Sequence, residues 1–384
     1  MTFKNSKYLR PARDFLFTPT LQSNSGEQGG RLDFIDGLRG LTMLMVVYWH
    51  VLVMSMNVTT YTAMTLQLFR MPLFFFISGF FAYSFNFDRS KLEKRLSNRW
   101  HKQFLPTFFI FLMFIIFEVA YTGAFNGVGE YLGSFFTSLR QNGLSEFKSG
   151  YWFTFVLVEV FCIFASISYL LCRFKLSRNI QGMIWLAIAG ICALVEWGYT
   201  KCVTPQSQES VKRLCEIMSL THLTRYQVFF YLGAAARAFD GAIWKLLSRR
   251  FVAFVVLALT VTVFYFTPRF RVPLGWFYGA AITGIIFSIT LFFYLRRFFA
   301  SNGVIGRMMK FVGKNTLPIY LFHYFIIRIM KDMDLSGLAL AIRTGAWVEI
   351  PLVVAISCVI VACVLGVDAL LKIKPRIHRL IFSA

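Results

Sequence analysis

The sequence predicts an all-α membrane protein, a bundle of about ten transmembrane helices. Its residues are 57% hydrophobic and only 15% charged, a balance typical of chains with several membrane spans. Apolar runs of helical length recur between charged or Gly/Pro-containing breaks, and about twenty apolar residues suffice for one bilayer crossing. The expected spans are 38–57, 67–86, 104–122, 151–172, 180–198, 226–238, 251–267, 274–295, 311–330 and 347–371. The sixth is short and the ninth contains Pro318, so these two are the least regular.

Lysine and arginine residues are distributed unevenly between these runs. With the N-terminus inside, the inside segments hold 28 of the 40 Lys and Arg, the outside segments hold 11, and Arg70 lies within the second run. Cytoplasmic loops of membrane proteins carry such an excess. We therefore expect both termini in the cytoplasm, with a polar basic tail at 1–36, a transmembrane domain at 37–371 and a short basic tail at 372–384.

The net charge of +22 would suggest nucleic acid as a partner in a soluble protein. Here the cations lie between hydrophobic segments, so topology and contact with anionic membrane lipids explain them better, and we expect no nucleic-acid partner. The first thirty residues lack the apolar core of a signal peptide. The cysteines form no metal-like cluster, and we expect no metal. Cys202 and Cys215 share one loop that the expected topology places on the extracytoplasmic side. The sequence allows either a disulfide between them or two free thiols.

The first apolar run contains the leading candidate for chemistry. His50 lies within it, and Asp36 and Arg39 stand at its start. Eleven positions separate Arg39 from His50, which places both within roughly 20° of one helix face and about 16 Å apart along the axis. Because ionisable groups inside membrane spans are costly, they usually mark function.

Two further ionisable residues are expected at a similar depth. Glu159 is eight residues into the fourth run, and His323 is twelve residues into the ninth, so each lies about 12 to 18 Å from the start of its span. The sequence allows two readings: the three groups face one another, or each is satisfied locally by a backbone carbonyl or a neighbouring hydroxyl.

A basic stretch, LEKRLSNRWHKQFLP, precedes the third run. Arg95 and Arg99 are four residues apart and share a helix face if the helix begins early. They and neighbouring cations would line a positively charged mouth suited to the phosphates of a nucleotide-bearing donor; these neighbours are Lys94, Lys102, Arg89 and Arg39. Ordinary loop charge is the alternative.

The second and fourth runs each add one candidate. Arg70, in FRMPLFFFISGFFAYS, lies on the outer side, where cations are scarce; it either snorkels to lipid headgroups or holds an anionic group of a substrate. Trp152 begins the fourth run in GYWFTFVLVE, and an interfacial anchor is the simpler reading.

These residues resemble acyltransferase family 3, a family of integral membrane O-acyltransferases. The similarity covers essentially the whole membrane portion: DGLRG followed by the Arg-x10-His spacing of Arg39 and His50, LFFFISGFF, the basic run, WF with Glu159, and NTLPIYLFH. Within the family, the run at 69–84 and the C-terminal LKIKPRIHRLIFSA are most similar to the glucan biosynthesis protein C type, which adds succinyl groups to osmoregulated periplasmic glucans.

The resemblance implies a multi-pass enzyme of the bacterial inner membrane. It would transfer an acyl group, succinyl or acetyl, from cytoplasmic acyl-CoA to a hydroxyl of an extracytoplasmic glycan. Two features depart from the family pattern. Arg95 and Arg99 replace the tight Arg-x-Arg pair of many members, and there is no room for an appended extracytoplasmic hydrolase-like domain, so we expect transfer to be completed within the membrane domain. The oligomeric state is not indicated.

In this reading His50 is the general base, since a neutral imidazole can take the proton of the attacking hydroxyl. Glu159 orients His50 or holds acceptor hydroxyls. Arg39, Arg95 and Arg99 bind phosphates, and Asp36 steadies Arg39. His323, Tyr320 or Trp152 donates a hydrogen bond to the thioester oxygen. Arg70 binds the carboxylate of a succinyl group.

Two other functions explain part of the pattern. A transporter or flippase of a glycan or lipid-linked anion accounts for the spans and buried charges but less well for Arg39 and His50. A transmembrane N-acetyltransferase needs the same donor site with an amine as acceptor.

Overall fold

The computed structural model describes residues 33–121 except Asn86, 144–203, 220–267, 272–296 and 303–373, with the single positions 129, 133, 298 and 382. The regular elements of this part are all helical, which confirms the all-α prediction. The α-helices are α2 (Asp33–His50), α3 (Tyr61–Ala82), α4 (Arg89–Arg99), α5 (Leu105–Tyr121), α7 (Leu144–Arg173), α8 (Arg178–Gly198), α11 (Leu220–Ala238), α12 (Asp240–Leu247), α13 (Arg250–Tyr265), α14 (Leu274–Tyr294), α16 (Val304–Lys314), α17 (Thr316–Lys331), α18 (Ser336–Arg343) and α19 (Ala346–Ile373). Most of both expected tails lies outside the described residues, as does Cys215, so the question of whether Cys202 pairs with it falls outside them too.

Helices of membrane-spanning length and composition recur along the described part of the chain. Seven qualify in the described part: Phe34–Ser55, Tyr61–Ala82, Arg89–Glu118, Tyr151–Arg173, Arg178–Lys201, Leu274–Tyr294 and Ala346–Ile373. An eighth forms if α12 and α13, which meet at an 84° bend, belong to one span. These eight correspond to eight of the ten expected runs and confirm a polytopic membrane protein.

The other two expected runs are helical but do not qualify. Residues 226–238 lie within α11, and the run 311–330 is divided at Asn315 between α16 and α17. Pro318 is the third residue of α17, where the missing N–H costs little because first-turn N–H groups have no partner within the helix. The expected count of ten is therefore not reached among the described helices.

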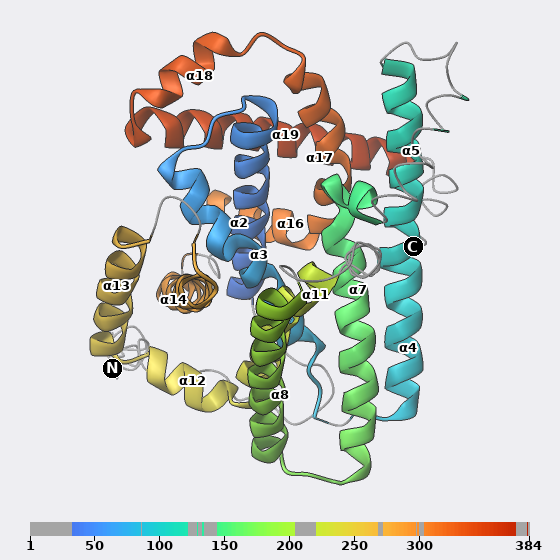
Figure 1. Cartoon of the computed structure of the whole chain (residues 1–384), viewed down its shortest axis with the longest axis vertical. Helices are drawn as coiled ribbons and strands as arrows, with labels where there is room; N and C mark the ends of the chain where they lie inside the picture. The colour runs from blue at the N-terminus through green and yellow to red at the C-terminus, as the bar shows by residue number, and fades with distance from the viewer. Residues whose placement is uncertain are drawn as a thin grey trace, which may run out of the picture.

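Helices α2 and α3 lie in the middle of the molecule, with α4, α5 and α7 on one side and α13 on the other, and α8 lies below them in the view of Figure 1. Close contacts at small residues hold the centre together. A Cβ built on Gly233 of α11 would lie 1.9 Å from the carbonyl oxygen of Phe76 in α3, and one built on Gly79 would lie 1.8 Å from the carbonyl oxygen of Phe230. The two backbones approach this closely only because both positions are glycine.

Within the described residues, three helices continue through a π-helical turn: η1 (Val51–Ser55), η2 (Trp100–Phe104) and η4 (Tyr199–Val203). The first begins directly after His50 and the second directly after Arg99. Such turns often occur at functional sites because they change the direction of nearby side chains. Two residues predicted from sequence thus stand at local irregularities.

Candidate functional site

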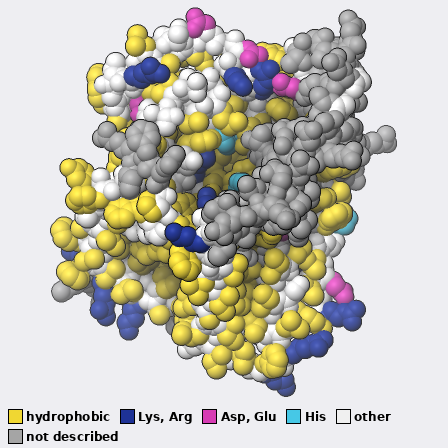
Figure 2. Space-filling view, in the orientation of Figure 1, with side chains coloured by type: hydrophobic (Ala, Val, Ile, Leu, Met, Phe, Trp, Pro, Cys, Tyr) yellow, Lys and Arg dark blue, Asp and Glu magenta, His cyan; other side chains and the backbone are white. Residues whose placement is uncertain are grey.

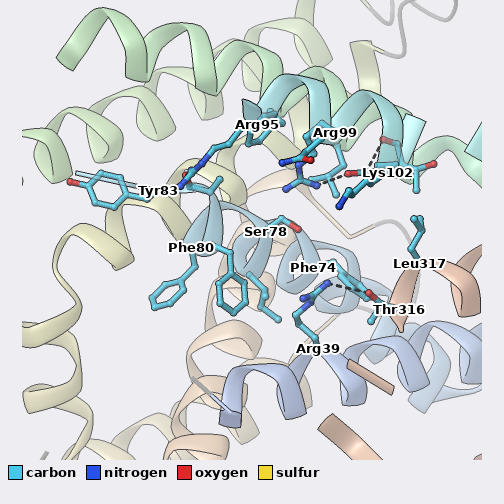
Figure 3. Close-up of a pocket in the computed structure, with 18 of the residues that line it drawn as sticks. Arg39, Phe74, Ser78, Phe80, Tyr83, Arg95, Arg99, Lys102, Thr316 and Leu317 are labelled. Atoms are coloured by element: carbon cyan, nitrogen blue, oxygen red, sulfur yellow. Dashed lines mark hydrogen bonds between the residues drawn. The ribbon is translucent and has the colours of Figure 1, made fainter. Parts of the chain in front are cut away.

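A cavity of about 1120 Å³ lies between α2, α3, α4, α7 and α17. It is lined by one acid, Asp36, and by six cationic side chains, Arg39, Arg95, Arg99, Lys102, Arg178 and Arg237. We call it the basic cavity. Figure 3 shows Arg95, Arg99 and Lys102 pointing into it from one wall and Arg39 from the opposite wall.

The cations on α2 and α4 are held mostly by neutral groups. Arg39 donates to the Thr316 hydroxyl at 3.2 Å, with Asp36 farther away at 3.9 Å. Arg99 donates to Gln103 Oε1 at 2.5 Å and lies over the Phe161 ring, while Arg95 donates to the carbonyl oxygen of Ala82. Arg95 and Arg99 thus have neutral partners, which fix their guanidinium groups without cancelling their charge. The cavity is therefore suited to a large polyanion.

The basic cavity contains as many cations as the sequence predicted, but Arg178 and Arg237 stand in place of Lys94 and Arg89. Arg178 and Arg237 come from the ends of α8 and α11 and share Asp240, at 3.0 and 3.1 Å. Of the neighbours expected at this mouth, Arg89 instead forms an exposed pair with Glu93 at 2.8 Å. The excess of cations on one side was visible in the sequence, but which of them share a cavity depends on how distant helices pack.

His50 and His323 meet in a buried dyad. His50 Nδ1 and His323 Nε2 are 2.9 Å apart, and the side chains are 7% and 0% exposed. His323 Nδ1 lies 3.0 Å from the carbonyl oxygen of Ile319, so that nitrogen carries the proton and donates. In the neutral dyad, Nε2 of His323 is then an acceptor, and Nδ1–H of His50 donates to it. This leaves the lone pair of His50 on Nε2, as a general base requires.

Two tyrosines connect this dyad to the basic cavity. Tyr324 Oη is 3.3 Å from His50 Nε2, and the centroids of the Tyr324 and Tyr320 rings are 6.0 Å apart. Tyr320 also lines the cavity. The two tyrosines thus lie between the cavity wall and the base nitrogen. Tyr324 was not singled out from the sequence, although it directly follows His323.

Helix periodicity explains this arrangement. On α2, Met43 lines the cavity and His50 follows seven residues later on the same face, about 10 Å farther along. On α3, Phe74 lines the cavity and Arg70 is one turn beyond it, as Tyr324 is beyond Tyr320 on α17. Buried polar groups from α2, α3 and α17 therefore continue the cavity inward. Figure 2 shows His and Lys/Arg side chains within the hollowed centre of one face.

Arg70 lies among aromatic rings beside this dyad. Its guanidinium carbon is 4.0 Å from the centroid of the Trp49 ring, and that indole is 5.3 Å from the His50 ring. Arg70 is 6% exposed, and neither Nε nor Nη1 has a hydrogen-bond partner among the described groups. Of the two readings open from the sequence, snorkelling does not fit, because a snorkelling side chain carries its charge to the surface.

Trp152 and Glu159 on α7 stand apart from the dyad. Trp152 packs on His222 and Tyr226, with ring centroids 4.4 and 5.2 Å away. Glu159 is half-buried and interacts electrostatically with Cys162 one turn later. Glu159 was expected either to orient His50 or to hold acceptor hydroxyls, and the described hydrogen-bond partners of His50 are His323 and Tyr324. A role for Glu159 toward acceptor hydroxyls stays a prediction.

The described residues contain no group of three or more His, Cys, Asp or Glu side chains that could hold a metal ion.

A family model described as an acyltransferase domain matches residues 32–368. The chain belongs to this acyltransferase family. No curated protein and no solved structure matched the chain in the corresponding searches. The family match covers the basic cavity, the dyad and Arg70, so a single acyltransferase domain contains them all. Group transfer, rather than transport without bond chemistry, is the activity that the family supports.

Proposed function

We propose that this acyltransferase transfers an acyl group, succinyl or acetyl, from cytoplasmic acyl-CoA to a hydroxyl of an extracytoplasmic glycan, such as a periplasmic glucan, at the bacterial inner membrane. The observation that carries the proposal is the continuity between the basic cavity and the dyad through Tyr320 and Tyr324. It joins a site for phosphates to a base that can activate a hydroxyl.

The donor would occupy the basic cavity. Arg39, Arg95, Arg99 and Lys102 approach from two walls, so phosphates between them would contact cations on both sides. The acyl thioester would then point along the faces of α2, α3 and α17 toward His50. Because the excess of cations marks the cytoplasmic side in the expected topology, the donor would enter from the cytoplasm.

The hydroxyl of the acceptor would attack the thioester carbonyl while His50 Nε2 takes its proton. His323 would hold the ring of His50 through Nδ1 and share the charge that develops. As the tetrahedral intermediate collapses, the C–S bond breaks and the thiolate of coenzyme A takes a proton, which Tyr324 and Tyr320 can relay from His50.

The oxyanion needs a hydrogen-bond donor, and His323 is less suited to this than the sequence suggested. Both of its nitrogens are occupied, one by His50 and one by the carbonyl oxygen of Ile319. The hydroxyl of Tyr320 or Tyr324 remains the better placed donor. Trp152 lies against His222 and Tyr226 and is more plausible as a platform for the sugar.

The test uses purified full-length protein in lipid nanodiscs, with labelled acetyl-CoA or succinyl-CoA and a glucan acceptor. We expect label in the glucan with the natural protein and a loss of about 100-fold or more with His50→Gln. His101→Gln, at an exposed histidine, is the matched control. Full transfer by the His50 variant would remove this residue from the mechanism, and the absence of transfer to any hydroxyl acceptor by the natural protein would refute the proposed function.

A further inference from the structure

Arg70 is a buried charged group beside the dyad that the transfer reaction described above does not use. Its guanidinium has five N–H donors and no acceptor of its own. Nε and Nη1 are buried without a hydrogen-bond partner in the described structure, and the side chain is 6% exposed. A charged group left in this state is strongly unfavourable unless an anion occupies the site during function.

The surroundings of Arg70 restrict what can pair with it. Its guanidinium lies against the face of Trp49, which fixes its plane and leaves the N–H groups at its edge directed elsewhere. A planar edge of this kind matches two oxygens of a carboxylate or phosphate. Trp49 also contacts the ring of His50, so an anion held by Arg70 would be beside the reacting groups.

The charge balance of the reaction points to the same conclusion. The described partners of the dyad are the neutral Tyr324 hydroxyl and the carbonyl oxygen of Ile319. When His50 takes the proton of the hydroxyl, a second buried cation forms near Arg70. Two like charges in a low-dielectric site repel strongly, and a substrate anion next to Arg70 would offset this repulsion.

We propose that Arg70 is an anchor for a substrate anion at the reaction centre, so that this acyltransferase prefers substrates carrying a carboxylate or phosphate close to the reacting carbonyl or hydroxyl. This inference rests on the proposed function. The anion has two possible sources: the far end of a dicarboxylic acyl group, or an anionic substituent on the acceptor glycan. Arg70 lies one helical turn beyond the cavity-lining Phe74, which is compatible with an acyl group that reaches past the thioester.

The kinetic test compares Arg70→Gln and Arg70→Lys with the natural protein in four substrate pairs: acetyl-CoA or succinyl-CoA, each with a neutral or an anionic glucan. If Arg70 binds the acyl carboxylate, Arg70→Gln should lower kcat/KM about 10- to 100-fold for the two pairs with succinyl-CoA; if it binds the acceptor, the same loss should occur for the two pairs with anionic glucan. This is the usual loss for a hydrogen bond to a charged group. Other pairs should change less than about threefold, and Arg70→Lys should recover part of the loss because it keeps the charge. Dependence on the donor identifies an acyl carboxylate, and dependence on the glucan identifies the acceptor.

The matched control is Arg328→Gln, whose guanidinium is already paired with Glu118 at 2.8 Å. It should affect all four substrate pairs equally. Equal losses in all four pairs with Arg70→Gln would overturn the proposal, because Arg70 would then act on something common to every reaction.

A binding measurement keeps the inference testable even if no transfer is detected. Non-hydrolysable thioethers of coenzyme A, one ending in a methyl group and one in a carboxylate, share every contact in the basic cavity and differ only at the far end. Neutral and anionic glucans form the corresponding acceptor pair. In the natural protein, we expect the anionic member of one of these pairs to bind at least tenfold more tightly than the neutral member. In Arg70→Gln, the two members of that pair should bind with equal affinity. Equal affinities in the natural protein for both pairs would refute an anion anchor, whereas a missing transfer reaction alone would refute only the proposed function.

Discussion

His323 acts through His50, and its contribution can be separated from that of a structural histidine. Its Nε2 accepts from His50 Nδ1 at 2.9 Å, which selects the tautomer whose lone pair is on Nε2. His323→Leu removes the acceptor, so we expect kcat to fall about 100-fold while KM for the donor changes little, because orientation of the base matters most in the transition state.

A conservative variant distinguishes this role from packing. In His323→Gln the side-chain oxygen can accept from His50 Nδ1–H, so part of kcat should return. Steady-state kinetics with labelled acyl-CoA measures both variants, and thermal unfolding in detergent checks that they fold. Identical kcat values for the Leu and Gln variants would contradict an orienting role.

At the scale of residues, the sequence identified single groups but not their partners. His50 and His323 were predicted at similar depth, and the α-helical period placed Arg39 and His50 on one face. That the two imidazoles face each other depends on the rotation and tilt of α2 and α17, which side-chain packing determines. The same limit applies to Glu159, whose predicted depth did not bring it to His50.

At the scale of elements, the contact between α3 and α11 positions Arg70 and Phe74. Gly233→Ala would place a Cβ 1.9 Å from the carbonyl oxygen of Phe76, and backbone atoms cannot move aside as a flexible side chain can. The helices must separate, so we expect a loss of about 1 to 3 kcal/mol in the free energy of unfolding, typical of overpacking. Transfer activity should fall with it, since α3 carries both residues.

Gly190 on α8 is the matched control, because a Cβ there meets no atom within 4 Å. Gly190→Ala should leave stability unchanged or raise it slightly, as alanine favours helix more than glycine. Thermal unfolding of both variants in the same detergent tests this difference. Equal stability of the two alanine variants would mean that α3 and α11 are not locked together at these glycines.

The division of the expected run 311–330 also belongs to this scale. Helix α16 exposes Val304, Ile305, Met308 and Phe311, with cations Arg307, Lys310 and Lys314 between them. This spacing of three and four residues is that of an amphipathic helix, and it was readable from the sequence. A scan for apolar runs missed it because such a scan ignores which face each residue occupies.

At the scale of the whole molecule, composition was the strongest guide. A chain that is 57% hydrophobic, with apolar runs of helical length between charged or Gly/Pro-containing breaks, can satisfy its backbone in lipid as helices, and the regular elements of the described part are helical. The basic cavity could be foreseen only in part: Arg39, Arg95 and Arg99 were expected together, whereas Arg178 and Arg237 arrive through the packing of α8 and α11.

The concentration of charge in that cavity predicts how donor binding responds to salt. Six cations and one acid line a single space, so the donor should be attracted electrostatically, and its KM should rise as ionic strength increases and screens the field. Arg99→Gln should raise KM for acyl-CoA about 10-fold, the effect of losing one hydrogen bond to a charged group, and should leave kcat nearly unchanged, because phosphates far from the carbonyl bind equally in ground and transition states.

Arg89 provides the control for this prediction, since it lies on the same helix, is exposed and pairs with Glu93 at 2.8 Å. Arg89→Gln keeps the same change in net charge but leaves the cavity lining intact, so KM should stay within about twofold of the natural value, as for surface charges. If both variants raised KM equally, the general charge of the cytoplasmic side would be attracting the donor. A larger effect at Arg99 would mean that phosphates bind between α2 and α4, in direct line with His50.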